Sequence, residues 1–140
     1  MDNKMKMTFL AKSENEAFAR TVVAGFVMNL DPTVEQITDV KTAVSEAVTN
    51  CVVHGYPDKM GEILLECEIT DRVLHIKIRD FGVGISNLDQ VLEPFYTSKP
   101  LEERAGMGFT IMRTFMDSFE VNSSPSNGTT VTMSKDFKIA

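Results

Sequence analysis

The sequence predicts an α+β fold: a two-layer α/β sandwich in which helices cover one face of a mixed or antiparallel sheet. Alternating polar and apolar residues predict strands near the start, in the middle and at the end of the chain. Apolar residues at helical spacing occupy the stretches between these strands. The two middle strands are separated by only two residues, which is the pattern of an antiparallel hairpin.

The first half of the chain is predicted to form one strand and two helices. Residues 4–11 alternate like a half-buried strand, and the S-x-x-E motif at Ser13 is a capping box for a helix that ends near Leu30. The D-P-T tripeptide at 31–33 breaks that helix, and its threonine forms a second capping box with the glutamine three residues later. The second helix is expected to end near His54.

The second half begins with the hairpin and ends with two further strands. Residues 62–70 and 73–79 form the hairpin, which leads directly to Asp80. Residues 86–105 lack periodicity, so we expect a long loop that acts as a lid, followed by an apolar helix that opens at Gly106. Two strands joined by the turn S-P-S-N-G then complete the sheet.

Length and composition favour a single globular domain, residues 1–140. Of these 140 residues, 43% are hydrophobic and 24% charged, enough to build one core. The formal net charge of -6 argues against binding to nucleic acid or an anionic membrane, because both need a surplus of Lys and Arg. We expect a cytoplasmic protein, because there is no signal-peptide core and no apolar run of roughly twenty residues. Cys51 and Cys67 lack metal-site spacing and are expected to be buried thiols.

The most informative feature is a set of polar residues at intervals of four: Glu46, Asn50 and His54. On an α-helix, residues at this spacing form one stripe along one face. A solvated polar face is the alternative interpretation for any one of them alone. Apolar residues of the same segment cluster on another face and are expected to pack in the core: Ile37, Val40, Val44, Val48 and Cys51.

Each residue of the stripe suggests a role in phosphoryl transfer. Asn50 offers an amide oxygen, a suitable ligand for Mg²⁺, which takes its remaining ligands from water and substrate phosphates. Glu46, one turn earlier, fits a general base or orienting group for the hydroxyl or water that attacks the terminal phosphate. His54 fits a hydrogen-bonding residue at the helix end, with a phosphate-side contact as the alternative.

Asp80 ends an alternating strand and is followed by Gly82 and Gly84. The sheet would fix its carboxylate while the glycines let the backbone turn sharply against a ligand. A buried carboxylate there would accept a hydrogen bond from an exocyclic amine such as that of adenine, and a plain strand-to-loop turn is the alternative. The D-F-G tripeptide does not indicate a eukaryotic-type protein kinase, because the glycine-rich loop, V-A-I-K and H-R-D motifs of that family are absent.

Phosphate is expected to bind where the lid meets the following helix. A helix N-terminus with glycines presents free amide N–H groups and a partial positive charge. The residues at this predicted opening are Gly106, Met107, Gly108 and Phe109. Lys99 and Arg104 of the lid would close over phosphates, or else are solvated charges. Four hydroxyl residues are candidates for ligand contacts or ordinary loop and strand residues: Thr97, Ser98, Thr129 and Thr130.

The order of these blocks resembles the N, G1 and G2 boxes of the GHKL ATPase/kinase superfamily of gyrase, Hsp90, histidine kinases and MutL. The matching blocks are Glu46-x-x-x-Asn50-x-x-x-His54, Asp80-x-Gly82-x-Gly84, Gly106-x-Gly108 and Gly128-Thr129-Thr130. Within this superfamily, the segments S-E-N-E-A-F-A-R, V-S-E-A-V-T-N and R-A-G-M-G-F-T-I-M are similar to those of the anti-sigma F factors of spore-forming bacteria. The resemblance covers nearly the whole chain.

The resemblance implies a sandwich that binds ATP or ADP with Mg²⁺, phosphorylates a serine of a small anti-anti-sigma protein, and as a homodimer sequesters the sporulation sigma factor, sigma F. Glu46 would be the catalytic base, Asn50 the metal ligand and Asp80 the adenine acceptor. Arg20 in the first helix would bind a partner, and Arg104 would contact phosphate or a partner. The other nucleotide contacts would be His54, Gly82, Gly84, Thr97, Ser98, Lys99, Gly106, Met107, Gly108, Phe109, Thr129 and Thr130.

Three other functions stay open on the sequence alone. A stress-response anti-sigma serine kinase would share the pocket and differ in its partner. A nucleotide-gated sequestering module would bind ATP with negligible phosphotransfer, although the presence of Glu46 argues for activity. The catalytic domain of a histidine kinase would have to act in trans, because neither His54 nor His75 lies on a phospho-acceptor helix.

Overall fold

A computed structural model describes residues 2–86, 88, 92 and 100–138, with the side chains of 100–105 left out of the description. Five strands form an antiparallel sheet in the order β1-β2-β3-β5-β4. The strands are β1 (Asn3–Leu10), β2 (Glu62–Thr70), β3 (Val73–Asp80), β4 (Ser118–Ser123) and β5 (Thr129–Asp136). The antiparallel form of the predicted sheet is therefore confirmed.

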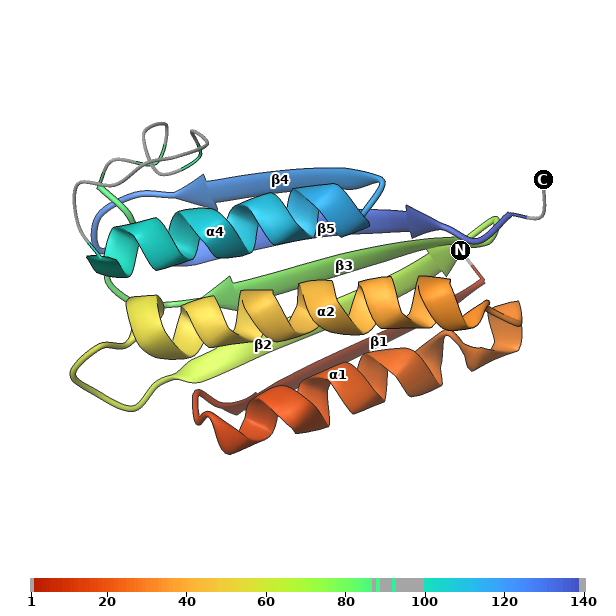
Figure 1. Ribbon diagram of the computed structural model, residues 1–140. Coiled ribbons are helices and arrows are strands. Elements are labelled where there is room, and N and C mark those ends of the chain that lie inside the picture. Colours follow the sequence, from red (N-terminus) through yellow and green to blue (C-terminus); the bar gives the residue numbers. More distant parts are fainter. Residues whose placement is uncertain (1, 87, 89–91, 93–99, 139–140) are drawn as a thin grey trace.

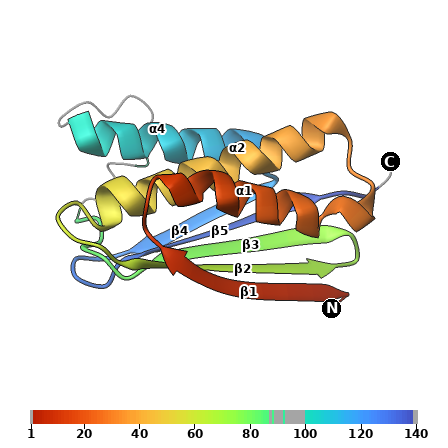
Figure 2. The same cartoon turned by 90° about the horizontal axis from the view of Figure 1, so that it is seen from below.

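The helices lie together on one face of this sheet (Figure 1). They are α1 (Glu14–Phe26), α2 (Val34–Asn50) and α4 (Pro100–Phe115), with a short 3-10 helix η1 (Met28–Leu30) and a π-helical turn η2 (Cys51–Gly55). Figure 2 shows the helical layer stacked on the sheet, with β1 at the sheet edge. The two-layer α+β architecture predicted from the sequence is confirmed.

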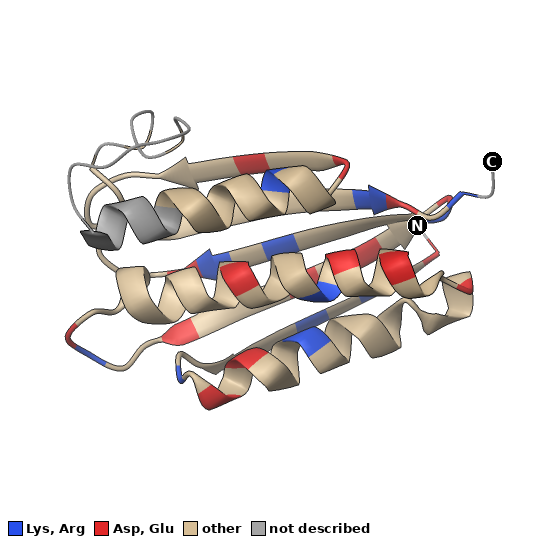
Figure 3. Ribbon diagram, in the orientation of Figure 1, with Lys and Arg blue, Asp and Glu red and all other residues tan. Residues whose placement is uncertain are grey.

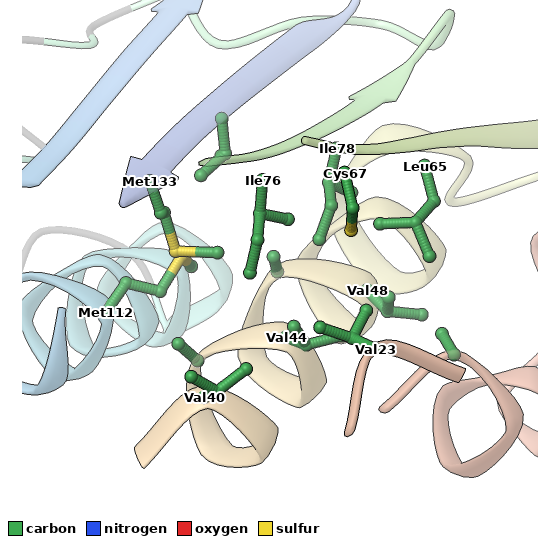
Figure 4. Packing of buried hydrophobic residues seen from close by; sticks show 14 of the residues in the cluster. Val23, Val40, Val44, Val48, Leu65, Cys67, Ile76, Ile78, Met112 and Met133 are labelled. Atoms are coloured by element: carbon green, nitrogen blue, oxygen red, sulfur yellow. The ribbon is translucent and has the colours of Figure 1, made fainter. Parts of the chain in front are cut away.

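The core lies between the two layers and is built from alternate residues of the strands and from the inward faces of the helices (Figure 4). Leu65, Ile76 and Met133 face the helices from neighbouring strands, while Met112 contributes from α4. The apolar face of α2 is confirmed, because Val40, Val44, Val48 and Cys51 are buried and Ile37 is partly buried against the same cluster. Both cysteines are buried free thiols, as predicted.

The two capping boxes predicted from the sequence have different outcomes. At α2, the Gln36 amide donates to Thr33 Oγ1 (3.1 Å) and the Thr33 amide donates to Gln36 Oε1 (2.9 Å), so this box is confirmed. The box at Ser13 is wrong, because Ser13 has helical backbone angles and its side chain makes no cap hydrogen bond. Both carboxylate oxygens of Glu16 instead accept hydrogen bonds from Arg20 Nη1, at 2.9 and 3.0 Å.

Several element boundaries differ from the predicted ones. The β2–β3 hairpin is confirmed, with Asp71 and Arg72 both in the left-handed region of a two-residue turn. The first helix ends at Phe26 instead of Leu30 and continues into η1. The second helix, α2, ends at Asn50. His54 lies in the π-helical turn η2, which has more residues per turn than an α-helix.

The start of α4 corrects the predicted helix opening. The helix begins at Pro100, a favourable first residue, so the prediction that it opens at Gly106 is wrong. Gly106 and Gly108 lie inside the helix and are buried against the rest of the protein. Most of the predicted lid lies outside the described residues. No helix in the described part of the chain is long and apolar enough to span a membrane.

Candidate functional site

Asp80 is the buried charged residue of the described chain, with 2% of its surface exposed at the end of β3. Its Oδ1 atom accepts hydrogen bonds from the Gly82 amide (3.0 Å) and the Thr129 amide (3.3 Å). Burial raises the pKa of the Asp80 carboxyl, and the Gly82 amide, the Cys51 thiol and the Thr129 amide oppose that rise. Both amides bind Oδ1, so Oδ2 accepts neither of them, and a carboxylate oxygen can accept more than one hydrogen bond.

The backbone after Asp80 needs glycine at two positions. A Cβ atom on Gly82 would lie 1.8 Å from the Gly55 carbonyl oxygen. Gly84 has a φ of +74°, and a Cβ there would lie 1.9 Å from the Ser124 carbonyl oxygen. The loop is thus held tightly between η2 on one side and the β4–β5 turn on the other.

A small cavity of ≈ 20 Å³ brings many of the predicted residues together beside Asp80. Its volume suits about one water molecule, so a nucleobase enters only if neighbouring side chains move apart. The predicted site residues that line it are Asn50, His54, Asp80, Phe109 and Thr129. They come from α2, η2, β3, α4 and β5, which shows that four sequence blocks converge at this end of the sheet.

Glu46 lies in a second, more open space. A groove of ≈ 340 Å³ is lined by residues of α1 and α2: Glu16, Arg20, Thr38, Lys41, Thr42, Ser45 and Glu46. The pKa of Glu46 is raised by partial burial and, to a smaller extent, by the negative charge of Glu16. The predicted polar stripe therefore divides between two spaces, with Glu46 in the groove and Asn50 and His54 at the cavity.

Charged residues of both signs occur on α1 and α2, the helices that flank the groove (Figure 3). Arg20 and Lys41 are its cations, and Glu16 and Glu46 are its anions. No basic stripe runs along these helices in that view. The groove is therefore suited to a protein segment or one small polar group better than to a long polyanion.

Asn50 has the polar atom that is left unsatisfied at this site. Its Nδ2 atom is buried and has no hydrogen-bond partner within the described part of the chain. A Cβ atom on Gly108 would lie 3.1 Å from this nitrogen and 3.2 Å from Glu46 Oε2, so α4 passes close to both side chains. An unpartnered buried amide fits a residue whose partner is a ligand.

Mg²⁺ fits this arrangement on the chemistry of the donors. No group of three or more His, Cys, Asp or Glu residues in the described chain is placed to hold a metal ion. A single amide oxygen from Asn50 is a suitable protein ligand when phosphate oxygens and water supply the others. The residues present therefore fit a magnesium ion that arrives with a nucleotide.

The structure does not bring all predicted residues to the cavity. Thr130 alternates with Thr129 and Val131, which line the cavity, so its side chain points to the other face of the sheet. Met107 is exposed on α4, and Gly106 is buried within that helix. Arg104 lies in α4, and its side chain is outside the description. Thr97, Ser98 and Lys99 lie outside the described residues.

Two residues beside Asp80, Gly55 and Tyr56, were not among the predicted site residues. A Cβ on Gly55 would lie 2.7 Å from Asp80 Cγ, so only glycine fits against the carboxylate. Tyr56 is buried, and its hydroxyl bonds to backbone groups on both sides of the site. The H-G-Y tripeptide was the available signal, because a polar residue, a glycine and a tyrosine follow directly after the polar stripe.

Comparison with known proteins places the chain in a family. Residues 9–135 match the histidine kinase-like ATPase domain family. A Clostridium beijerinckii anti-sigma F factor is 55% identical over 99% of this chain and 97% of its own length. A Thermoanaerobacter anti-sigma F factor is 53% identical over 95% of this chain and 93% of its own length.

Solved structures support the fold. The RsbU and RsbW domains of a Mycobacterium tuberculosis protein match 96% of this chain and 32% of that chain, with a TM-score of 0.70 and 18% identity. At this identity the likeness concerns the fold alone. The family match and the relatives over nearly full length show that the chain belongs to the histidine kinase-like ATPase domain family and, within it, to the anti-sigma F factors.

Proposed function

We propose that this protein binds Mg-ATP, transfers the terminal phosphate to a serine of an anti-anti-sigma protein, and sequesters a sporulation sigma factor, sigma F. Its relatives at 53–55% identity over nearly the full length are named anti-sigma F factors. The observation that carries the proposal is the placement of Glu46 beside Asn50 on α2, both next to the backbone of Gly108. The proposed base, which lines the open groove, is then adjacent to the proposed metal ligand, which lines the cavity.

Nucleotide recognition would take place at the buried end of the site. Asp80 Oδ2 would accept a hydrogen bond from the exocyclic amine of adenine, because Oδ1 is held by two backbone amides. His54, Phe109 and Thr129 would complete this end of the pocket. Gly82 and Gly84 would keep the loop close to η2 and the β4–β5 turn. ADP would bind through the same contacts.

Phosphoryl transfer would take place at the groove end. Asn50 would hold Mg²⁺, which when bound neutralises phosphate charge. Glu46 would accept the proton of the serine hydroxyl, and its raised pKa makes it a stronger base than an ordinary carboxylate. Gly108 lets α4 approach both side chains, and the backbone of α4 would border the phosphates.

Partner binding would use the same groove. Arg20 lines it together with Glu46, so a protein that docks on Arg20 would lie next to the base. The remaining assignments also belong to this proposal: one domain over residues 1–140, a homodimer in the cytoplasm, no nucleic acid or membrane partner, and nucleotide contacts from Thr97, Ser98, Lys99, Arg104, Gly106 and Met107. A stress-response kinase with a different sigma partner would keep the same site.

The test is a phosphotransfer assay with labelled ATP, Mg²⁺ and the anti-anti-sigma protein of the same organism. Wild-type protein should label a serine of the partner, and Glu46→Ala should lose the label while it keeps ATP affinity. Glu35→Ala, which changes an exposed glutamate at the start of the same helix, is the matched control and should keep activity. Normal ATP binding without any label would indicate a nucleotide-gated sequestering module instead.

A further inference from the structure

We propose that Tyr56 is a positioning residue for nucleobase recognition, because its hydroxyl holds the loop that fixes the Asp80 carboxylate. The inference rests on the proposed function, in which Asp80 binds the nucleobase amine. Tyr56 itself would not touch the nucleotide. It would act through the backbone of Phe81 and Gly82.

The Tyr56 hydroxyl joins two backbone groups that are distant in sequence. It donates a hydrogen bond to the Glu62 carbonyl (2.8 Å) and accepts one from the Phe81 amide (2.7 Å). Glu62 is the first residue of β2, and Phe81 follows the last residue of β3. The hydroxyl therefore links the start of one strand to the loop after its neighbour.

The ring of Tyr56 is itself confined, so its hydroxyl has a defined position. The residue is 7% exposed. A Cβ atom on Gly61 would lie 2.2 Å from a carbon of the ring, which shows that the ring packs directly on the glycine backbone. A side chain held on both its face and its polar tip loses little further freedom when a ligand binds.

The held loop is the one that orients Asp80. Phe81 is bonded to Tyr56, Gly82 donates to Asp80 Oδ1, and Val83 donates to the Gly55 carbonyl at 3.0 Å. Three successive amides are thus fixed by η2, Tyr56 and the carboxylate itself. Release of the Phe81 amide would let the Gly82 amide move, and Asp80 would lose one of the two donors that hold Oδ1 in place.

The experiment compares ATP with purine riboside triphosphate, which lacks the exocyclic amine, in equilibrium binding measurements. The wild-type protein should prefer ATP. Tyr56→Phe keeps the ring and removes the hydroxyl, so it should lose about tenfold in ATP affinity, the usual effect of one buried hydrogen bond, and much less for the analogue. Ile76→Val, a core change in the same sheet, is the matched control and should leave the preference for ATP unchanged.

The outcomes separate this inference from the proposed function. A wild-type protein without preference for ATP would contradict the role of Asp80 itself. A wild-type preference that Tyr56→Phe retains, or an equal loss for both nucleotides, would show that the tyrosine only stabilises the fold. Gly61→Ala, which pushes on the ring without removing the hydroxyl, should give the same selective loss.

Hydrogen exchange gives a readout that does not depend on any nucleotide. The Phe81 and Gly82 amides should exchange faster with solvent in Tyr56→Phe than in the wild type, while the Ile76 amide in the sheet should keep its protection. Unchanged exchange at Phe81 would overturn the inference. A uniform rise across β3 would do so as well, because it would indicate general destabilisation.

Discussion

The two ends of the site differ in how far the protein satisfies its own polar groups. At the proposed nucleobase end, Asp80 accepts two amide hydrogen bonds and the Tyr56 hydroxyl makes two more. At the proposed phosphate end, the buried Asn50 Nδ2 has no partner in the described part of the chain, and Glu46 lies in an open groove. The first end is pre-organised before any ligand arrives. The second depends on a ligand and a partner to complete it.

This contrast assigns different tasks to the two ends. A rigid, satisfied end can discriminate between ligands, because a wrong ligand leaves a buried acceptor without a donor. An incomplete end favours the ligand that supplies the missing contacts. Substitutions should therefore affect recognition and chemistry separately, depending on which end they touch.

The largest effect is expected from Asp80→Asn at the nucleobase end. ATP affinity should fall by about 100-fold, because a charge-assisted hydrogen bond to the amine is lost. Stability at neutral pH should stay equal or rise, since the asparagine oxygen still accepts the two amides and no buried charge remains. Calorimetric titration with ATP and urea unfolding measure the two quantities.

Asp39→Asn is the control for Asp80→Asn and should show the opposite pattern. Asp39 Oδ2 accepts a hydrogen bond from Lys135 Nζ at 3.1 Å, and both side chains are largely buried at the far end of α2. Stability should fall by about 1–2 kcal/mol, because the lysine loses its counter-ion, while ATP affinity stays unchanged. A loss of ATP binding in this variant would mean that the site responds to general destabilisation.

The next effect is expected at the phosphate end, from Gly108→Ala. The new methyl group would press on Asn50 and Glu46, at 3.1–3.3 Å, so phosphotransfer should fall by roughly tenfold while stability changes little. Gly25→Ala on α1 is the matched control, because nothing lies within 4 Å of its Cβ position. It should raise stability by about 0.5–1 kcal/mol without any change in activity. Equal activity in both variants would contradict the role of α4.

The pH dependence of phosphotransfer tests the groove. Glu46 must be ionised to accept a proton, and its pKa is raised above the ordinary value of 4.5, so activity should begin to fall at a higher pH than for an ordinary carboxylate. Glu16→Gln removes the nearby negative charge and should move this acidic limb to lower pH. The shift should shrink in high salt, because both groups are partly exposed. If the acidic limb of the pH profile does not move in Glu16→Gln, the charge of Glu16 does not contribute to the raised pKa of Glu46.

A smaller effect is expected in how the free energy of unfolding depends on pH. The native pKa of Asp80 is raised above 3.8, so the folded state binds more protons than the unfolded state at pH values between the two. The free energy of unfolding should therefore fall as pH rises from 3.8 through the native pKa and then level off. Relative to the wild type, Asp80→Asn should gain stability over this same window. Urea unfolding at several pH values measures it, and a gain confined to acid pH would contradict the sign.

The smallest effect concerns the two thiols, which should not react with a thiol reagent in the folded protein. Burial raises the pKa of Cys67 to about 12 and that of Cys51 well above its ordinary value. A thiol reagent should therefore modify neither residue at neutral pH until denaturant is added. Rapid labelling of Cys51 alone would show that the nucleobase end opens more readily than its hydrogen bonds suggest.

Local patterns predicted much of the fold correctly. The apolar face of α2, the β2–β3 hairpin and the Thr33 capping box depend on residues close together in sequence, and all were found. The Ser13 box failed because Glu16 had a competing partner, Arg20, one turn further along the same helix. A sequence can match the capping-box pattern while its glutamate pairs with another side chain instead of the N-cap amide.

The parts of the site that escaped prediction depend on contacts between distant segments. Periodicity correctly grouped Glu46 with Asn50, but it could not show that α1 would form a groove beside the first of them. The start of α4 at Pro100 and the two hydrogen bonds of Tyr56 likewise follow from tertiary packing. The sequence alone therefore predicted local elements better than the contacts between distant segments.

The position of β1 at the sheet edge has a consequence for how the chain folds during synthesis. β1 pairs only with β2 in the described sheet, and the register joins Asn3 to Ile69 and Leu10 to Glu62. Both α1 and α2 leave the ribosome before that partner exists. Until β2 is synthesised, β1 has no strand to pair with, and Met5, Met7 and Phe9 lack the contacts that partly bury them in the folded protein. Closure of this long loop is expected to be a late and slow step, and the apolar residues of the nascent N-terminal segment stay exposed until then.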